Sequence, residues 1–248
     1  MTSLFVMVPG FGGPHMPEKV RFLQQNLEII RRNQWSRLRV RICVYDTNIM
    51  PFVPPELTTD PDIEWIFEEG IVGQFIHRHA PPPFVETFDH VLIILDDIEL
   101  MDSVDFGKLL HIDSMFQLDV YSPCMTLDSK YQFKYMLHMP DHPCVLKITC
   151  ALEAFCYFMP TKSYHRYWQH IDPEKNPWLW GLDMCLYKCL GIRAAVLNGM
   201  QMKHHYKNEC YYLRTDTNPC DGYNSVMDKF KVTSEQLADQ PAILYMVF

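Results

Sequence analysis

Two short apolar runs constrain the fold of this chain most. Residues 4–8 read Leu-Phe-Val-Met-Val and stop at Pro9-Gly10, and the strongly apolar residues 88–95 stop at a group of acidic residues. A strand that is buried on both faces carries apolar residues at successive positions, and such strands belong to parallel sheets that helices cover. The two runs therefore predict an α/β protein with buried parallel strands.

The first 46 residues open this fold with a strand, a helix and a second strand. Apolar residues recur at helical spacing between residues 20 and 30, and residues 39–45 alternate before a turn at residues 46–48. A strand–helix–strand unit predicts a right-handed crossover between the two strands.

Further elements are expected along the rest of the chain. Residues 51–62 carry four prolines and predict an irregular connector, and the tail from about residue 208 is expected to be irregular until residue 242. We predict helices over residues 63–79, 104–116, 128–138, 163–170 and 182–190, and strands over residues 146–149, 155–159, 194–197 and 242–247. No repeat or linker divides the chain, so we expect one α/β domain over residues 1–248, with a mixed, mostly parallel sheet flanked by helices.

Charge and composition exclude several classes of protein. With 30 acidic and 22 basic residues the formal net charge is −8, which argues against a surface that binds nucleic acid, because such a surface needs a basic face. The shares of hydrophobic and charged residues, 48% and 21%, are those of an ordinary globular protein.

The nine cysteines and the N-terminal residues indicate which cellular compartment to expect for the protein. Nine is an odd number and no Cys-x-x-Cys pair occurs, so a complete disulfide framework is excluded and a zinc ribbon is not expected. Free, buried thiols in a reducing compartment are the expectation. The N-terminal run lacks a basic region and a cleavage site, and no segment has 18 continuous apolar residues, so we predict a cytoplasmic protein without signal peptide or membrane span.

An acidic cluster directly follows the buried strand at residues 88–95. Asp97 and Glu99 are two positions apart, which places their carboxylates on the same side of an extended segment. Ligands of open α/β sheets bind beyond the carboxyl ends of the strands, and two carboxylates suit Mn²⁺ or Mg²⁺ with positions left for diphosphate oxygens. An acidic turn that caps a helix explains the cluster equally well.

Two later motifs favour a metal site over a helix cap for this acidic cluster. Residues 176–183 read Asn-Pro-Trp-Leu-Trp-Gly-Leu-Asp, and Lys203-His204-His205 follows a short strand some twenty residues later. An acidic pair after a buried strand, an aromatic-Gly-x-Asp element and a late histidine, in this order, resemble the layout of GT-A glycosyltransferases. More narrowly, the two later motifs resemble a glycosyltransferase-like domain of unknown function found in plant proteins and in proteins of large algal viruses.

The resemblance implies roles for individual residues. Asp97 and Glu99 match the metal and diphosphate motif, with Glu where the family commonly has Asp, and Asp96 matches a ribose or sugar contact. His204 or His205 closes the metal site, and His204 is preferred; an imidazole beside carboxylates favours Mn²⁺ over Mg²⁺.

Asp183 matches the general base of inverting enzymes. We expect its carboxylate to be ionised at a helix N-terminus, where it could also act as the helix cap.

Other residues are candidates for the nucleotide-sugar. Val8, Pro9 and Gly10 follow the first strand, Asp46 ends the second, and the faces of Trp178 and Trp180 suit a sugar ring. A turn residue at Asp46 and core tryptophans are the alternatives. The dinucleotide fingerprint fails because His15 replaces its third glycine, and no phosphate-binding P-loop motif occurs.

The resemblance therefore implies a metal-dependent glycosyltransferase. It is expected to move a sugar from a nucleotide-diphosphate sugar, a UDP-sugar such as UDP-xylose or UDP-glucose, to an oligosaccharide or glycan hydroxyl with inversion. Residues 1–115 are expected to bind the donor and residues 116–248 the acceptor. Two alternatives stay open: a nucleotide-sugar hydrolase or phosphohydrolase on the same acidic site, and a non-catalytic carbohydrate-binding module.

Overall fold

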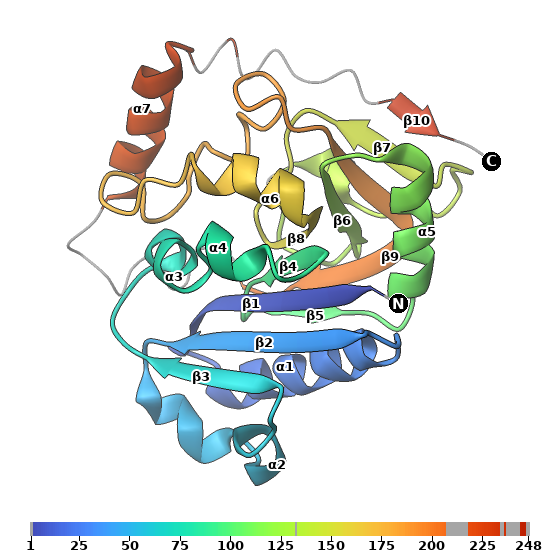
Figure 1. Ribbon diagram of the computed structural model, residues 1–248. Coiled ribbons are helices and arrows are strands. Elements are labelled where there is room, and N and C mark those ends of the chain that lie inside the picture. The colour runs from blue at the N-terminus through green and yellow to red at the C-terminus, as the bar shows by residue number, and fades with distance from the viewer. Residues whose placement is uncertain (1, 132, 207–217, 234–235, 237–243, 247–248) are drawn as a thin grey trace.

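One sheet with helices around it forms the molecule (Figure 1), and the computed structural model describes residues 2–131, 133–206, 218–233, 236 and 244–246. The strands are β1 (Ser3–Phe11), β2 (Arg37–Val44), β3 (Ile63–Phe67), β4 (His90–Ile94), β5 (Ile98–Leu100), β6 (Val120–Met125), β7 (Leu146–Thr149), β8 (Cys156–Pro160), β9 (Ala194–His204) and β10 (Leu244–Met246). The α-helices are α1 (Met16–Arg31), α2 (Pro55–Thr58), α3 (Val72–His79), α4 (Pro82–Val85), α5 (Phe106–Phe116), α6 (Thr161–Trp168) and α7 (Pro219–Phe230), and the 3-10 helices are η1 (Thr47–Phe52) and η2 (Lys134–Met136).

The sheet is mixed, with the order β10-β7-β9-β6-β8-β4-β1-β2-β3, and β5 pairs with β9 outside this path. Strands β4, β1, β2 and β3 run parallel to one another, as do β6 and β9. Strand β8 joins the two groups because it runs antiparallel to both β4 and β6. Most of the paired residues in the described chain lie in parallel pairs. The predicted fold class, an α/β domain with a mixed, mostly parallel sheet flanked by helices, is confirmed.

Both faces of β1 are covered, which explains its continuous apolar run. Val6 and Val8 lie beside Leu23 of α1 around a small gap in the core. Phe5 points to the opposite face, where its ring centroid lies 5.1 Å from that of Phe84 in α4. Helices therefore pack on both sides of this strand, as the sequence predicts.

Helix α1 carries a polar residue, Asn26, on its buried face. The side-chain amide of Asn26 donates to the carbonyl of Ile98 at 2.8 Å, and the backbone N–H of Leu100 donates to its Oδ1 at 2.7 Å. Both partners belong to β5. The short strand that follows the acidic cluster is thus held by α1 as well as by β9.

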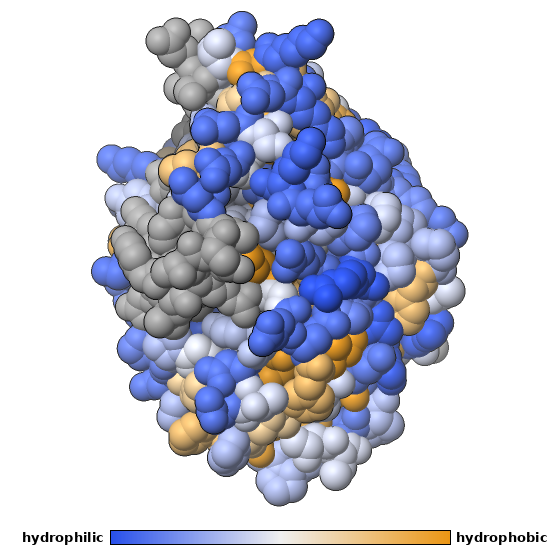
Figure 2. Space-filling view, turned by 90° about the vertical axis from the view of Figure 1, so that its left-hand side faces the viewer, coloured by the Kyte–Doolittle hydropathy of each residue, from blue (hydrophilic) through white to orange (hydrophobic). Residues whose placement is uncertain are grey.

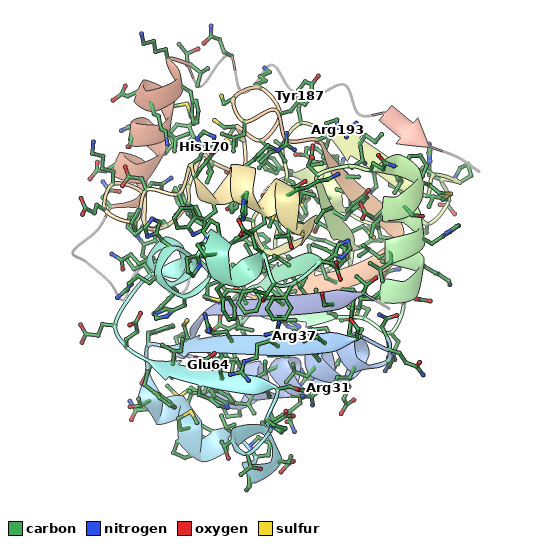
Figure 3. All side chains as sticks on the ribbon, viewed as in Figure 1. Arg31, Arg37, Glu64, His170, Tyr187 and Arg193 are labelled. Carbon is green, nitrogen blue, oxygen red and sulfur yellow. The ribbon has the colours of Figure 1, made fainter. Side chains whose placement is uncertain are left out.

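The predicted helix over residues 63–79 is wrong in its first part. Ile63–Phe67 is strand β3, whose backbone pairs with β2, and α3 begins only at Val72, beyond Gly70. The charged side chains agree with this pairing, because Nη2 of Arg41 on β2 lies 2.8 Å from Oε2 of Glu64 on β3. Figure 3 labels Glu64 on this edge strand.

The predicted helix over residues 182–190 is also wrong. These residues belong to a run of turns over residues 180–190, which includes Gly181 with a φ of 82°. The N–H of Tyr187 donates at 3.2 Å to the carbonyl of Cys150, outside the segment, where a helix would direct it to the preceding turn.

Other expected elements need smaller corrections. Of the predicted helix over residues 128–138 only η2 forms, strand β6 was not predicted, and the connector at residues 51–62 includes the end of η1 and all of α2. Residues 207–217 of the expected irregular tail lie outside the described residues, but the tail also contains α7, with Asn218 as its cap.

The described thiols agree with the expectation of free cysteines. The eight cysteines that the structure describes are free, and five of them are buried. Within the described chain no helix has the length and apolarity to cross a membrane. On the face that Figure 2 shows, hydrophobic residues gather in the lower half. Among the exposed large hydrophobic residues are Phe52 of η1 and Phe67 of β3, at 49% and 53%.

Candidate active site

A cavity of about 480 Å³ lies at the carboxyl ends of β1 and β4. Its lining combines four acidic residues with aromatic and aliphatic ones. The described residues that line it are Pro9, Gly10, Tyr45, Gly70, Ile71, Val72, Phe75, Leu95, Asp96, Asp97, Glu153, Ala154, Phe155, Trp178, Leu179, Trp180, Gly181, Asp183, Met184 and Tyr223. The site thus draws on segments from both halves of the chain.

Asp97 and His204 meet beside this cavity. Oδ2 of Asp97 lies 3.1 Å from Nε2 of His204, and Nδ1 of His204 lies 2.6 Å from the carbonyl oxygen of Lys130. Burial opposes charge on both groups, but their mutual attraction outweighs it, so the pKa of Asp97 falls below and the pKa of His204 rises above its ordinary value. The lysine carbonyl fixes the ring so that Nε2 faces Asp97.

Asp96 lines the cavity and also contacts other residues of the protein. Its Oδ2 lies 2.8 Å from Nζ of Lys19 and accepts the N–H of Gly12 at 3.2 Å, while Nζ of Lys19 also donates to the carbonyl of Gly12 at 2.7 Å. Burial raises the pKa of Asp96 to about 6, against the attraction of Lys19. The predicted ribose or sugar contact of Asp96 stays a prediction; the structure gives this carboxylate a partner within the protein.

Glu99 is not brought to the cavity with Asp97. Its Oε2 lies 2.7 Å from Nε2 of His205, and its Oε1 lies 3.4 Å from Nη1 of Arg21. Strand β5 begins at Ile98, so Glu99 is paired across β5 and β9, opposite Lys203. Its place in a metal site stays a prediction, whereas His204, the preferred histidine, is the one beside Asp97.

Asp183 lies in the turns that replace the predicted helix. Oδ1 accepts the N–H of Met184 at 3.0 Å, and the Asp183 carbonyl accepts the N–H of Leu152 at 3.2 Å. Burial raises the pKa of Asp183 to about 7, and the charge of Glu153 adds to this effect. The expectation of a carboxylate kept ionised by a helix N-terminus is therefore wrong, because no helix starts here and the surroundings favour the protonated form.

The aromatic segment before Asp183 is fixed by Asn176. Its side-chain amide donates to the carbonyl of Trp180 at 2.9 Å, and the N–H of Gly73 in α3 donates to the carbonyl of Pro177 at 2.7 Å. The side chain of Trp180 is 37% exposed and lines the cavity. An exposed ring at the cavity wall is available for stacking on a ligand.

The residues predicted for the nucleotide separate into two groups. Pro9 and Gly10 line the cavity, whereas Val8 is only 3% exposed and belongs to the core. Asp46 caps η1, because its Oδ1 accepts the N–H of Asn48 at 3.1 Å, and it is not among the described lining residues. This geometry is that of the turn residue considered as the alternative, so nucleotide binding by Asp46 stays a prediction.

The residues beside the cavity fit a divalent cation that takes further ligands from its substrate. Among the described residues no three His, Cys, Asp or Glu side chains form a metal-binding group. Asp97 and His204 offer two ligands, and Oδ1 of Asp97 is buried with no hydrogen-bond partner in the described chain. A carboxylate oxygen with an imidazole nitrogen suits Mn²⁺, and the open positions suit diphosphate oxygens and water.

The sequence interpretation missed Lys19, and it took Glu153 as a lone acid that could hydrogen-bond a sugar hydroxyl or cap a neighbouring loop. Lys19 and Asn26 are polar positions on the apolar stripe of α1, and polar residues at core spacing in a helix are a signal for buried partners. Lys19 could have been marked for this reason. Glu153, in the apolar stretch Ala-Leu-Glu-Ala-Phe, is 1% exposed.

Comparisons with known proteins bear on the fold. No protein-family model and no curated protein matches the chain. A crystal structure of GalNAc-T7 with UDP, GalNAc and Mn²⁺ matches with a TM-score of 0.59 and 10% identity, over 96% of this chain and 50% of that one. A complex of a Drosophila β-1,4-galactosyltransferase 7 mutant with manganese, UDP-Gal and xylobiose matches with a TM-score of 0.49 and 11% identity, over 94% and 82% of the two chains.

The fold is therefore GT-A-like, as the sequence resemblance implies. The chain spans half the length of the GalNAc-T7 structure. At 10% identity the likeness concerns the fold and does not extend to substrates.

Proposed function

We propose that this chain is a divalent-metal-dependent glycosyltransferase that transfers a sugar from a nucleotide-diphosphate sugar to a hydroxyl of an oligosaccharide or glycan. The contact between Asp97 and His204 carries the proposal, because it offers two metal ligands beside a cavity that also contains Asp183. The solved GT-A structure that matches with a TM-score of 0.59 holds UDP, GalNAc and Mn²⁺, which supports a UDP-sugar as donor.

The charges of the cavity support a role for the metal. Its described lining includes four acidic residues and no lysine or arginine. A diphosphate brought into such a cavity would meet like charges, which repel it. A divalent cation held by Asp97 and His204 would reduce this repulsion and would supply positive charge to offset that on the leaving nucleotide diphosphate.

The protein residues divide the work as follows. Asp97 and His204 would hold the metal, and Pro9 and Gly10 would form the wall next to the nucleotide. Asp183 accepts the proton of the acceptor hydroxyl as its oxygen bonds to the anomeric carbon, while the electrons of the bond to the donor phosphate leave with the nucleotide diphosphate. Attack opposite the leaving group predicts inversion.

The two halves of the chain have separate tasks in this proposal. Residues 1–115 contribute Asp97 and the donor wall, and residues 116–248 contribute Asp183, the tryptophans and His204. UDP-xylose and UDP-glucose are the candidate donors. The narrower resemblance to the plant and algal-virus domain stays a prediction.

Calorimetry of donor binding tests the proposal. UDP-sugars are titrated into the full chain with Mn²⁺ and then with EDTA in place of the metal. Binding of a UDP-sugar that requires Mn²⁺ supports the function, and the absence of binding to every nucleotide-sugar contradicts it. Rapid donor breakdown without acceptor would instead favour the hydrolase, and product NMR that shows retained configuration would refute inversion.

A further inference from the structure

A short turn packs against the end of β9, beside His204. It comprises residues 126–130, which directly follow β6. The N–H of Thr126 donates to the carbonyl of Met202 at 2.9 Å, and the N–H of Lys130 donates to the carbonyl of His204 at 3.0 Å. The turn therefore continues the contact between β6 and β9 beyond the last residue pair of the two strands.

Ser129 is a buried residue of this turn, with 5% of its surface exposed. Its Oγ accepts the backbone N–H of His204 at 3.3 Å and lies 2.9 Å from Oγ1 of Thr126. Its own N–H donates to the carbonyl of Thr126 at 3.1 Å. The hydroxyl of Ser129 thus connects the start of the turn to the backbone of the residue that carries the imidazole.

The same turn supplies a hydrogen-bond acceptor for the ring of His204. Nδ1 of His204 lies 2.6 Å from the carbonyl oxygen of Lys130. A carbonyl oxygen only accepts hydrogen bonds, so Nδ1 carries a proton and Nε2 is the nitrogen left for a metal. The ring centroid of Phe155 lies 4.1 Å from that of His204. The imidazole is therefore held by the turn and by a neighbouring aromatic ring.

We propose that Ser129, itself held by Thr126, is a positioning residue for the metal ligand His204. By accepting the His204 N–H it keeps the turn where the Lys130 carbonyl reaches Nδ1, so that Nε2 faces Asp97. The inference rests on the proposed function for the metal, whereas the position of the ring is a property of the chain alone. Hydrogen-bond partners of a ligating histidine fix its tautomer and orientation, and their removal weakens metal binding by about 10- to 100-fold.

The first measurement follows the ring N–H of His204 by NMR in metal-free protein that carries ¹⁵N in its histidines, with His204→Ala assigning the signal. A proton held between Nδ1 and the Lys130 carbonyl exchanges slowly with water. We expect Ser129→Ala to accelerate this exchange by at least about tenfold, because the turn that carries the carbonyl is no longer fixed. Unchanged exchange in folded Ser129→Ala overturns the proposal.

The second measurement is Mn²⁺ binding, followed by electron paramagnetic resonance. Ser129→Ala should bind Mn²⁺ about tenfold more weakly than the natural chain. Ser103→Ala is the matched control, because the Ser103 hydroxyl also accepts a backbone N–H of β9, that of Gln201, at 2.9 Å. This control should leave both the exchange rate and the Mn²⁺ affinity unchanged. Equal losses in the two variants would overturn the proposal, since any hydrogen bond to β9 would then have the same effect.

Two further variants protect the test against misfolding. Ser129→Thr keeps the hydroxyl and should retain the slow exchange and the Mn²⁺ affinity. If circular dichroism shows that Ser129→Ala does not fold, Thr126→Val takes its place, because valine keeps the shape of threonine and removes the hydroxyl that contacts Oγ of Ser129. Natural exchange and natural Mn²⁺ affinity in Thr126→Val would then overturn the proposal.

The two measurements separate this inference from the proposed function. Faster exchange in Ser129→Ala, together with Mn²⁺-dependent donor binding by the natural chain, supports both. Faster exchange in Ser129→Ala without Mn²⁺ binding by the natural chain supports the positioning of the ring and refutes the metal-dependent function. Mn²⁺ binding and sugar transfer by the natural chain, with unchanged exchange in Ser129→Ala, do the reverse.

Discussion

Oδ2 of Asp97 lies 3.1 Å from Nε2 of His204, although the two residues are 107 positions apart in the chain. Asp97 follows β4 in the parallel part of the sheet, and His204 ends β9 in the other part. Strand β5, which pairs with the end of β9, brings the two segments together. The contact therefore depends on the whole sheet and not on either half.

The first prediction concerns the metal. Asp97→Asn and His204→Ala should each weaken Mn²⁺-dependent binding of a UDP-sugar by at least about 100-fold, because each removes one of two protein ligands. Calorimetry with and without Mn²⁺ measures the loss. His205→Ala is the matched control, since the side chain of His205 contacts Glu99, and its bond to Asp97 runs from the backbone N–H, which alanine keeps. If His205→Ala weakens binding as much as His204→Ala, the assignment of the ligand is wrong.

Asp183 should determine how transfer depends on pH. With a pKa of about 7, its base form increases as the pH rises, so kcat/KM should climb about tenfold per unit below pH 7 and level off above it. Asp183→Asn should remove transfer and leave donor binding unchanged. Steady-state rates between pH 5 and pH 9, with calorimetry of the donor, measure both effects, and transfer by Asp183→Asn at the normal rate would rule this base out.

The same group should make stability depend on pH. The pKa of Asp183 is about 7 in the folded protein and 3.8 for an ordinary aspartate, so the native state holds this proton more tightly. Its stabilising contribution is complete below pH 3.8 and is lost as the pH rises through about 7. Asp183→Asn should therefore be more stable than the natural chain at pH 8, by up to roughly 3–4 kcal/mol. Urea unfolding should show this gain shrinking towards pH 4.5, and a gain independent of pH would contradict the assignment.

The buried ion pair of Lys19 and Asp96 should contribute to the stability of the folded protein. Their side chains are 1% and 8% exposed, so Lys19→Met leaves a buried carboxylate without its cation. We expect a loss of roughly 3–5 kcal/mol in the free energy of unfolding at pH 8. Lys19→Met combined with Asp96→Asn should recover a large part of it. Urea unfolding of the natural chain, Lys19→Met, Asp96→Asn and the double variant measures the coupling, and strictly additive losses would show that the two residues act independently.

Trp180 should contribute to ligand binding by stacking. Trp180→Ala is expected to raise the KM for donor or acceptor by about two- to tenfold, which corresponds to roughly 0.5–1.5 kcal/mol for one aromatic contact. Trp180→Phe should retain most of the affinity. Tyr187→Ala serves as control, because Tyr187 is 55% exposed, lies in the same turns (Figure 3) and does not line the cavity. Equal effects of Trp180→Ala and Tyr187→Ala would speak against a stacking role.

The parallel part of the fold was predictable because burial on both faces leaves a continuous apolar run. Strand β6, Val120–Met125, is equally buried but contains Ser122 and Pro123, and it was missed. Ser122 satisfies its hydroxyl locally by donating to the carbonyl of Pro123 at 3.2 Å, and the register of β6 on β9 shifts between Pro123 and Cys124. A proline is tolerated at such an irregularity, which the sequence alone does not reveal.

Sequence periodicity was also misleading at two site residues, Asp183 and Glu99. Apolar residues at helical spacing after Gly181 suggest a helix, yet the hydrogen bond between Tyr187 and Cys150 favours turns. Period two places Glu99 beside Asp97 on a straight strand, but β5 begins between them and Glu99 pairs with His205. Asp97 and His204 were predictable as candidates from chemistry; which histidine faces Asp97 depends on the register of β5 on β9.

The register of β5 on β9 also determines when this part of the site can form during synthesis of the chain. Among the described strands, β9 is the one partner of β5, so the segment behind Asp97 lacks its sheet pairing until residues 202–204 have been synthesised. A growing chain that ends before this point can complete the parallel strands β1 to β4 while the acidic turn has no opposing histidine. Metal-binding capacity would then be acquired late in synthesis, after most of the apolar core has formed.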